Sequence, residues 1–345
     1  MCLLIRWKNQ GTERIQERKG YFMKAYLDIC QEILDTKTNL SDNRTGIKTL
    51  RNPAGATFIH DMDMGFPLVT TKKMGLKNIA TELEFFIKGI TDKKWLQDRK
   101  CTIWDEWASA PKWQRTFQQK IANTQIEKQR KLTDQEVQEL KNQCMNLERD
   151  LGPIYGFQWR HFGGKYEFDP ARIEHDPTDN FDHTHRGVDQ VNNAIEKLKT
   201  DPTNRRIIVN AWNPVDEQKM ALPPCHIMHQ LLVDGNKLNL IWTQRSCDMF
   251  LGVPYNIASY ALLLMLYAKE AGLKPGILKG ELHDAHIYEN HIPQMREQIS
   301  RTPYELPTVE IPDENWNGML AWQAANGFKL NNYKCHDRLR GDVAR

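Results

Sequence analysis

The chain of 345 residues contains 40% hydrophobic and 26% charged residues, and its formal net charge is +3. This composition is typical of a globular protein and excludes a disordered or collagen-like chain. The small net charge argues against a strong field for nucleic acid. The most apolar run, 257–268, is shorter than the ~20 residues that span a bilayer, so we expect no membrane span.

The cysteines are scattered along the chain. There are seven of them, an odd number, from Cys2 to Cys335, and no Cys-x-x-Cys pair occurs. This pattern disfavours a secreted disulfide framework and a cysteine-based zinc site. We therefore expect a reducing, cytoplasmic location and no metal. Residues 1–22 carry an apolar patch too short for a signal peptide, and we interpret them as an N-terminal extension before Met23.

The first patterned segments mix helices and strands. Apolar residues at helical spacing predict a helix over 24–35. The polar, turn-rich segment 41–49 predicts a loop, and 66–71 predicts a short strand. A second helix is predicted over 78–89, with a glycine at its end.

Segment 108–149 differs in character, because it is rich in Gln, Lys and Glu. Thr133 and Glu136 form a capping-box pattern, and apolar residues between Val137 and Leu147 then share one helical face. We interpret this segment as a peripheral helical insertion without chemistry. The acidic, histidine-containing segment that follows it (165–186) matches no metal-ligand spacing and predicts a solvated loop.

The C-terminal half is strongly patterned. It predicts a helix over 188–198, strands over 206–212, 229–233 and 238–244, and a long apolar helix over 256–271. Helices and strands do not alternate regularly as βαβ units do. The pattern therefore favours an α+β fold over a doubly wound sheet.

One thiol has an unusual neighbourhood. Cys225 lies between two prolines and His226, although a lone buried cysteine is most often structural. Arg205-Arg206 and Gln244-Arg245-Ser246 are separate cationic pieces. If the fold brings them near Cys225, they lower the pKa of the thiol and bind an anion such as phosphate. Ordinary surface ion pairs are the alternative that spacing leaves open.

Seven sequence blocks then resemble the thymidylate synthase family. They run in family order as FPLVTTKK (66–73), TIWDEWA (102–108), DLGPIYGFQWRHFG (150–163), NRRIIVNAWNP (204–214), MALPPCH (220–226), QRSCDMFLGVPYNIASYALL (244–263) and DAHIYENH (284–291). The resemblance implies the α+β thymidylate synthase fold, in which a large mixed β-sheet with flanking helices packs on its twin in a homodimer. It implies one catalytic domain over 23–345 that carries the insertion 108–149.

The resemblance also implies a substrate, dUMP, and a one-carbon co-substrate, 5,10-methylenetetrahydrofolate. Cys225 matches the nucleophile that adds to C6 of uracil. Glu82 matches the general acid/base, and Tyr155 matches the phenol that orders water near C5. The matching phosphate ligands are Arg44, Arg245 and Ser246, together with Arg205 and Arg206 reaching from the partner subunit.

Gln244 and Asn256 belong to the implied substrate site, and Asn256 matches the amide that reads O4 and N3–H of the base. Cytosine-specific relatives carry Asp there, so Asn256 favours dUMP over dCMP, while capping the 256–271 helix is the structural alternative. His286 and Tyr288 match the pair that binds the deoxyribose 3′-hydroxyl. The implied folate residues are Ile103, Trp104, Trp107, Leu222, Gly252, Tyr255 and Ala344, with Asp248 for the pterin and Lys72 for the glutamate.

Several positions depart from the family pattern, namely Gly75, Lys77, Glu84, Phe85, Thr243, His283 and the C-terminal Arg345. The family's apolar C-terminal tail closes over the site and excludes water. A charged tail therefore favours an alternative, hydroxymethylation of dUMP with release of tetrahydrofolate. Retained Trp104 favours methylation to dTMP with release of dihydrofolate. A nucleic-acid-binding module built on Arg205 and Arg206 is the remote alternative, disfavoured by the small net charge.

Overall fold

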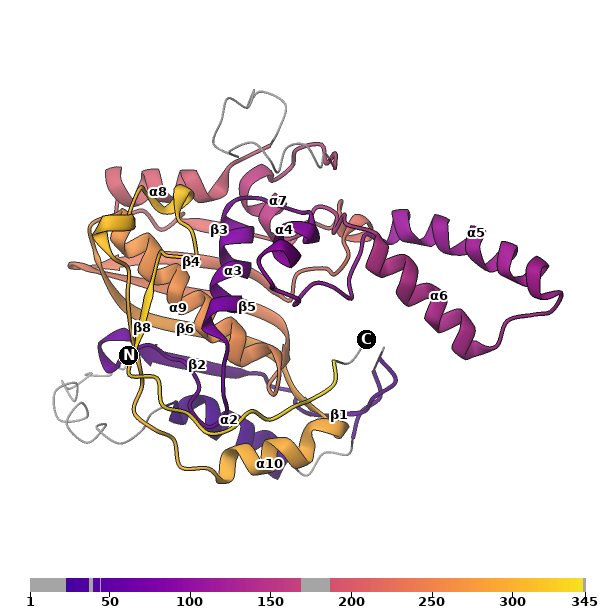
Figure 1. The fold of residues 1–345 in the computed structure, drawn as a ribbon. Helices are drawn as coiled ribbons and strands as arrows, with labels where there is room; N and C mark the ends of the chain where they lie inside the picture. The colour runs from indigo at the N-terminus through magenta and orange to yellow at the C-terminus, as the bar shows by residue number, and fades with distance from the viewer. Residues whose placement is uncertain (1–22, 37–39, 44, 169–186, 344–345) are drawn as a thin grey trace, which may run out of the picture.

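The computed structural model describes residues 23–36, 40–43, 45–168 and 187–343 (Figure 1). Its centre is one six-stranded sheet in the order β1-β6-β5-β4-β3, with β2 also paired to β6. Only β5 and β6 pair in parallel, so the sheet is mixed, and the expected mixed α+β architecture is confirmed. The strands are β1 (Thr49–Asn52), β2 (Ala56–Asp61), β3 (Ile208–Asn210), β4 (His226–Asp234), β5 (Lys237–Asp248) and β6 (Lys274–Tyr288).

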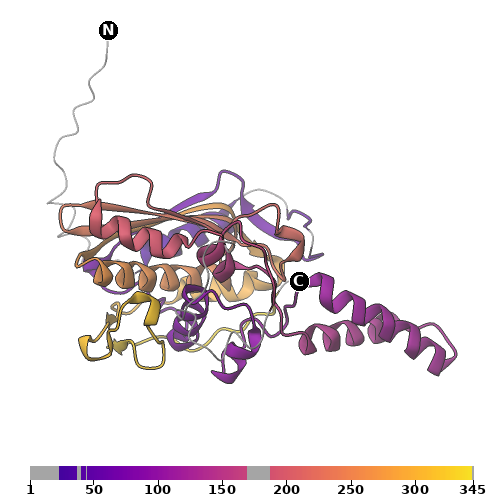
Figure 2. The ribbon, with the colours of Figure 1, turned by 90° about the horizontal axis from the view of Figure 1, so that it is seen from above.

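Helices and the C-terminal segment lie along one side of this sheet, as Figure 2 shows for α3 and α9. The main helices are α2 (Lys24–Asp35), α3 (Leu76–Ile87), α4 (Lys93–Asp98), α7 (Tyr155–His161), α8 (Gln190–Thr200), α9 (Gly252–Glu270) and α10 (Ile292–Ser300). The apolar α9 packs between β5, β6 and α3, which explains why it is hydrophobic almost all round. No helix in the described part of the chain combines the length and apolarity needed to cross a bilayer.

The opposite face of the sheet carries exposed apolar side chains. Strand alternation turns Leu240 and Trp242 of β5 inward, whereas Ile241 points to the other face and is only half-buried. Across the strands, register aligns Ile241 with neighbours on β2, β6, β4 and β3. That row is Ile59, Lys279, Ile241, Gln230 and Ile208, and we call it the open-face row. Ile59 is 54% and Ile208 is 42% exposed.

The helices predicted over 24–35, 78–89, 188–198 and 256–271 correspond to α2, α3, α8 and α9. The three predicted C-terminal strands correspond to β3, β4 and β5, although β3 is shorter than expected and β4 and β5 are longer.

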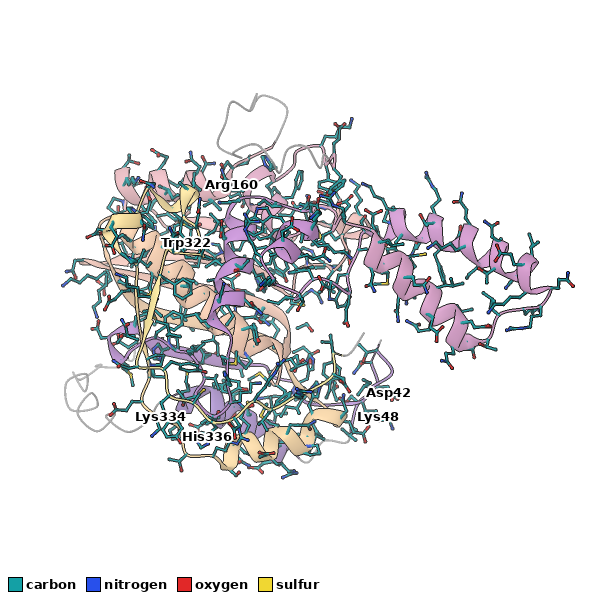
Figure 3. The ribbon with its side chains drawn as sticks, in the orientation of Figure 1. Asp42, Lys48, Arg160, Trp322, Lys334 and His336 are labelled. Atoms are coloured by element: carbon teal, nitrogen blue, oxygen red, sulfur yellow. The ribbon has the colours of Figure 1, made fainter. Side chains whose placement is uncertain are left out.

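The strand predicted over 66–71 is wrong, because this buried segment is irregular. Its backbone groups pair with single residues of distant segments instead of one neighbouring strand. The Phe66 N–H donates to the Pro307 carbonyl at 2.8 Å, and the His336 N–H donates to the Thr70 carbonyl at 2.8 Å. Figure 3 shows His336 on the C-terminal segment that runs past α10. The apolar run therefore records burial and not a sheet ladder, and Pro67 lacks the N–H that a ladder needs.

Two antiparallel helices project from the body as an arm (Figures 1 and 2). They are α5 (Ala110–Lys128) and α6 (Asp134–Leu147). Thr133 and Glu136 cap α6 reciprocally, with the Glu136 N–H 3.3 Å from the Thr133 hydroxyl and the Thr133 N–H 2.8 Å from the Glu136 carboxylate. The extension 1–22 and residues 169–186 of the predicted loop lie outside the described residues.

Candidate functional site

Cys225 directly precedes β4 and is half-buried. Pairing of β4 with β5 places Arg245 beside it, since the Arg245 N–H donates to the Cys225 carbonyl at 2.8 Å. The guanidinium donates to the carbonyls of Pro223 (3.0 Å) and Pro224 (2.9 Å). It also lies 5.3 Å from the Trp212 ring, a contact that sequence reasoning missed. A fixed positive charge is therefore held against the segment that carries the thiol.

An aromatic and acidic cluster from α3, α7 and the 102–109 loop adjoins Cys225. The Tyr155 hydroxyl accepts the Cys225 N–H at 2.7 Å. The Trp104 indole donates to the Glu82 carboxylate at 2.7 Å, and the Trp104 and Tyr155 rings are 6.2 Å apart. Burial raises the pKa of Glu82 to about 7, and the Trp104 hydrogen bond opposes that rise. Glu82 can therefore both hold and release a proton near neutral pH.

His226 is a member of this cluster that the site prediction omitted. Its ring stacks on Tyr155 with centroids 4.2 Å apart, and its Nδ1 lies 2.9 Å from the Tyr260 hydroxyl. Burial lowers the pKa of His226 to about 3, and His229 adds to the effect. A neutral imidazole supports the Tyr155 ring without adding charge. Because His226 directly follows Cys225 in the sequence, its place in the site could have been predicted.

A chain of side-chain amides orients Asn256. The Trp242 indole can only donate, and it donates to the Gln244 carbonyl oxygen at 3.1 Å. The Gln244 amide nitrogen must therefore face the other way, and it donates to the Asn256 Oδ1 at 3.0 Å. This orientation leaves the Asn256 Nδ2 as a donor and the second lone pair of its Oδ1 as an acceptor.

The parallel pairing of β5 with β6 gathers a polar group at one end of the sheet. Register sets Asp248 beside His286 and Ser246 beside Asp284. The rings of His286 and Tyr288 meet edge to face at 5.0 Å. The Asp248 Oδ1 accepts the N–H groups of the two residues before α9, at 2.9 and 3.1 Å. These residues come from distant parts of the chain and form one polar corner.

Most side chains expected to form the apolar wall are partly accessible to solvent. Ile103, Trp107, Leu222 and Tyr255 are half-buried and pack against the core, while Trp104 is buried. Gly252 begins α9 and is half-buried.

Lys72, the residue expected to bind the folate glutamate, has a buried side chain. It is 4% exposed, donates to the Phe250 carbonyl and lies 4.0 Å from the Phe250 ring centre. Burial lowers the pKa of Lys72 to about 8. In this structure its ammonium is therefore directed into the protein.

Arg205 and Arg206 are exposed on the turn before β3, where the Arg206 N–H donates to the Asn204 side chain and the Arg205 carbonyl accepts from the Gln230 amide. Arg44, Ala344 and Arg345 lie outside the described residues. Within the ranges the structure covers, no three His, Cys, Asp or Glu residues are grouped for metal binding.

Two departures from the family pattern have local explanations. The Glu84 carboxylate is buried, and it accepts from the Lys88 ammonium at 2.7 Å and the Ala324 N–H at 2.8 Å. The His283 side chain is exposed, and it is the backbone of His283 that Gly55 approaches closely. A Cβ at Gly55 would lie 2.9 Å from the His283 carbonyl oxygen.

Comparison with known proteins identifies the family of the chain. Residues 24–345 match the family model described as thymidylate synthase. The chain is 38% identical over 319 residues to a bifunctional dihydrofolate reductase-thymidylate synthase of Paramecium tetraurelia. The match covers 92% of this chain and 60% of that relative. The chain thus spans less than two thirds of the relative's length.

Proposed function

Because the chain belongs to the thymidylate synthase family, we propose that it is a one-carbon transferase that methylates dUMP to dTMP. The proposed co-substrate is 5,10-methylenetetrahydrofolate, which leaves as dihydrofolate. One observation carries the proposal: the Cys225 segment is bound by Arg245 on one side and by Tyr155 on the other. A reducing compartment keeps thiols such as that of Cys225 reduced, so we propose that the protein acts in the cytoplasm.

The proposed chemistry begins at Cys225. Its thiolate adds to C6 of the uracil ring, and the electron pair of the C5–C6 bond moves to give an enolate that is nucleophilic at C5. The nearby Arg245 guanidinium favours the thiolate. Glu82, whose pKa burial raises to about 7, serves the proton transfers at O4 and C5, with Tyr155 ordering the water between them.

The proposed apolar wall suits a folate, because half-buried Trp107, Leu222 and Tyr255 offer apolar surface for its rings. The Asp248 carboxylate is the proposed acceptor for the pterin. When bound, the folate supplies the one-carbon unit and the reducing equivalents. The chain's own residues orient it and exclude water. The position of Lys72 does not support a contact with the glutamate tail.

Base selection follows from the orientation of Asn256. Uracil presents an acceptor at O4 and a donor at N3–H. The Asn256 Nδ2 and Oδ1, as the Trp242 and Gln244 hydrogen bonds orient them, supply the complementary donor and acceptor. Cytosine presents the opposite pair, so the same amide disfavours dCMP. The polar corner at His286 and Tyr288 supplies hydrogen bonds for the deoxyribose.

The product assay tests this proposal directly. We expect the protein, given dUMP and methylenetetrahydrofolate, to form a nucleotide heavier by CH₂ together with dihydrofolate, and to leave dCMP unchanged. Mass spectrometry of the nucleotide and absorbance of the folate measure both products. A nucleotide heavier by CH₂O with tetrahydrofolate would identify the hydroxymethylase alternative. No conversion at all would reject the enzyme and favour a binding module.

We also propose a homodimer formed through the open-face row. Ile59, Ile241 and Ile208 supply apolar area on the open face of the sheet, as an obligate interface requires. The exposed Arg205 and Arg206 lie just before β3, at the edge of this sheet. In the proposal they cross to the phosphate of the partner subunit.

Subunit mixing tests the dimer proposal. Cys225→Ser and Arg205→Ala/Arg206→Ala proteins should each be nearly inactive alone. Co-expressed with different tags and purified as mixed dimers, they should recover activity. Randomly mixed subunits should show about a quarter of wild-type activity, because half of the dimers hold one complete site. If the arginines act within their own subunit, mixing restores nothing. Light scattering checks that each variant remains dimeric.

A further inference from the structure

Lys93 is a fully buried lysine at the start of α4. Its side chain belongs to the largest fully buried ones, at 1% exposure. The ammonium donates to the carbonyl oxygens of Asp105 (3.0 Å), Trp107 (3.0 Å) and Met145 (2.6 Å). An ammonium has three donors, and all three are satisfied here by backbone carbonyls. A buried charge is costly unless it is bound in this way. The arrangement therefore strongly favours one relative position of α4 and the segments that supply the carbonyls.

The three carbonyls come from two different segments. Asp105 and Trp107 belong to the 102–109 loop, which also carries Trp104, whereas Met145 lies in the last turn of α6. Two further ion pairs join the same body to the base of the arm. Arg149 donates to the buried Asp92 through Nε at 3.1 Å, and the Lys112 ammonium lies 2.7 Å from the Asp150 carboxylate. The arm is therefore anchored by charged groups at its root.

A short path leads from Lys93 to Glu82. The ammonium holds the Trp107 carbonyl, while the Trp107 N–H donates to the Trp104 carbonyl at 3.1 Å. The Trp104 indole in turn donates to Glu82 at 2.7 Å. Displacing the loop would lengthen this last hydrogen bond and shift Trp107 within the apolar wall.

We propose that Lys93 is a positioning residue for the proposed reaction: its buried ammonium holds the 102–109 loop so that Trp104 binds Glu82 and Trp107 faces the folate. The α5–α6 arm supplies one of its three acceptors. The arm is thus part of the support of the folate wall, which revises the interpretation of 108–149 as a peripheral insertion. The activity readouts below rest on the proposed function.

The test compares Lys93→Met with Lys94→Met. Lys94 is the adjacent lysine, and its exposed ammonium pairs with Asp98 at 2.6 Å. In Lys93→Met we expect the KM for the folate to rise about tenfold and the KM for dUMP to stay within about twofold, because the loop carries proposed folate contacts but no proposed dUMP contact. Lys94→Met should behave as wild type. Equal KM values in wild type and Lys93→Met, with only a lower Tm, would overturn the proposal.

The pH profile supplies a readout that a merely structural role would not move. The Trp104 hydrogen bond stabilises the Glu82 carboxylate, so its loss should raise the apparent pKa that limits kcat. Trp104→Phe removes this hydrogen bond and should raise that apparent pKa, and Lys93→Met should raise it too. The other titratable groups facing Glu82 are Cys101, Tyr155 and Tyr255. Burial raises their pKa values, so they stay neutral in this range. An unmoved profile counts against the proposal.

Amide hydrogen exchange separates this inference from the proposed function. Exchange in the 102–109 loop should be faster in Lys93→Met than in Lys94→Met, whether or not the protein converts dUMP. Unchanged exchange would overturn the positioning role even in an active enzyme. If Lys93→Met does not fold, Lys93→Gln, which keeps two N–H donors, takes its place in the same comparison with Lys94→Met.

Discussion

Replacing Cys225 with serine is expected to reduce turnover of dUMP by a factor on the order of 10⁴ or more. A serine hydroxyl is not ionised near neutral pH, so it cannot add to C6 even beside the Arg245 guanidinium. Steady-state kinetics measure the loss. With 5-fluoro-dUMP and methylenetetrahydrofolate, the wild-type protein should form a covalent adduct visible by denaturing mass spectrometry, and the serine variant should form none.

Cys335 provides the matched control, because it is half-buried as Cys225 is. Cys335→Ser should keep both turnover and the adduct. An adduct that survives in Cys225→Ser, or one that disappears in Cys335→Ser, would place the nucleophile elsewhere. Unchanged turnover in Cys225→Ser would reject covalent catalysis by this residue.

Replacing Glu82 with glutamine should have opposite effects on activity and stability. Turnover should fall by about 10²- to 10⁴-fold, because the amide cannot transfer protons. The pKa of Glu82 is raised by burial to about 7, so the folded protein favours the neutral carboxyl. The stability from that neutral form is fully present below about pH 4.5 and is lost as pH rises through 7.

Glutamine is neutral at every pH and still accepts the Trp104 hydrogen bond. At pH 8.5 the variant should therefore exceed wild type in free energy of unfolding by an amount on the order of 2 kcal/mol. Near pH 4.5 the difference should vanish. Denaturant titrations at the two pH values measure it. Glu196→Gln, at an exposed position on α8, is the control and should show no such pH dependence. A gain that is the same at both pH values would contradict the buried-carboxyl explanation.

The stabilising prediction concerns a residue that sequence reasoning selected by resemblance. Glu82 lies on a helix whose buried side chains are mostly apolar, and burying a carboxyl there without a role would be costly. The structure adds the physical cause of its pKa and the identity of its hydrogen-bond donor, Trp104. Neither follows from spacing, because the 102–109 loop reaches α3 only through tertiary packing.

The missed strand β6 shows why some elements escape sequence patterns. Its sequence contains Pro275, Gly276 and Gly280, which normally weaken a strand. The structure explains Gly280: a Cβ there would lie 2.3 Å from the Trp242 indole, so only glycine allows this close approach. Gly280 therefore meets a packing requirement imposed by β5.

Local patterns by themselves determined much of this protein. Periodicity predicted α2, α3, α8 and α9, the capping box predicted the start of α6, and the residue blocks indicated the family, because these features depend only on neighbours in the chain. Tertiary structure alone decided that β5 and β6 pair in parallel, that segment 66–71 forms no strand, and that the ammonium groups of Lys72 and Lys93 are buried. These outcomes depend on contacts between residues far apart in sequence, and one-dimensional spacing carries no information about which distant groups will meet.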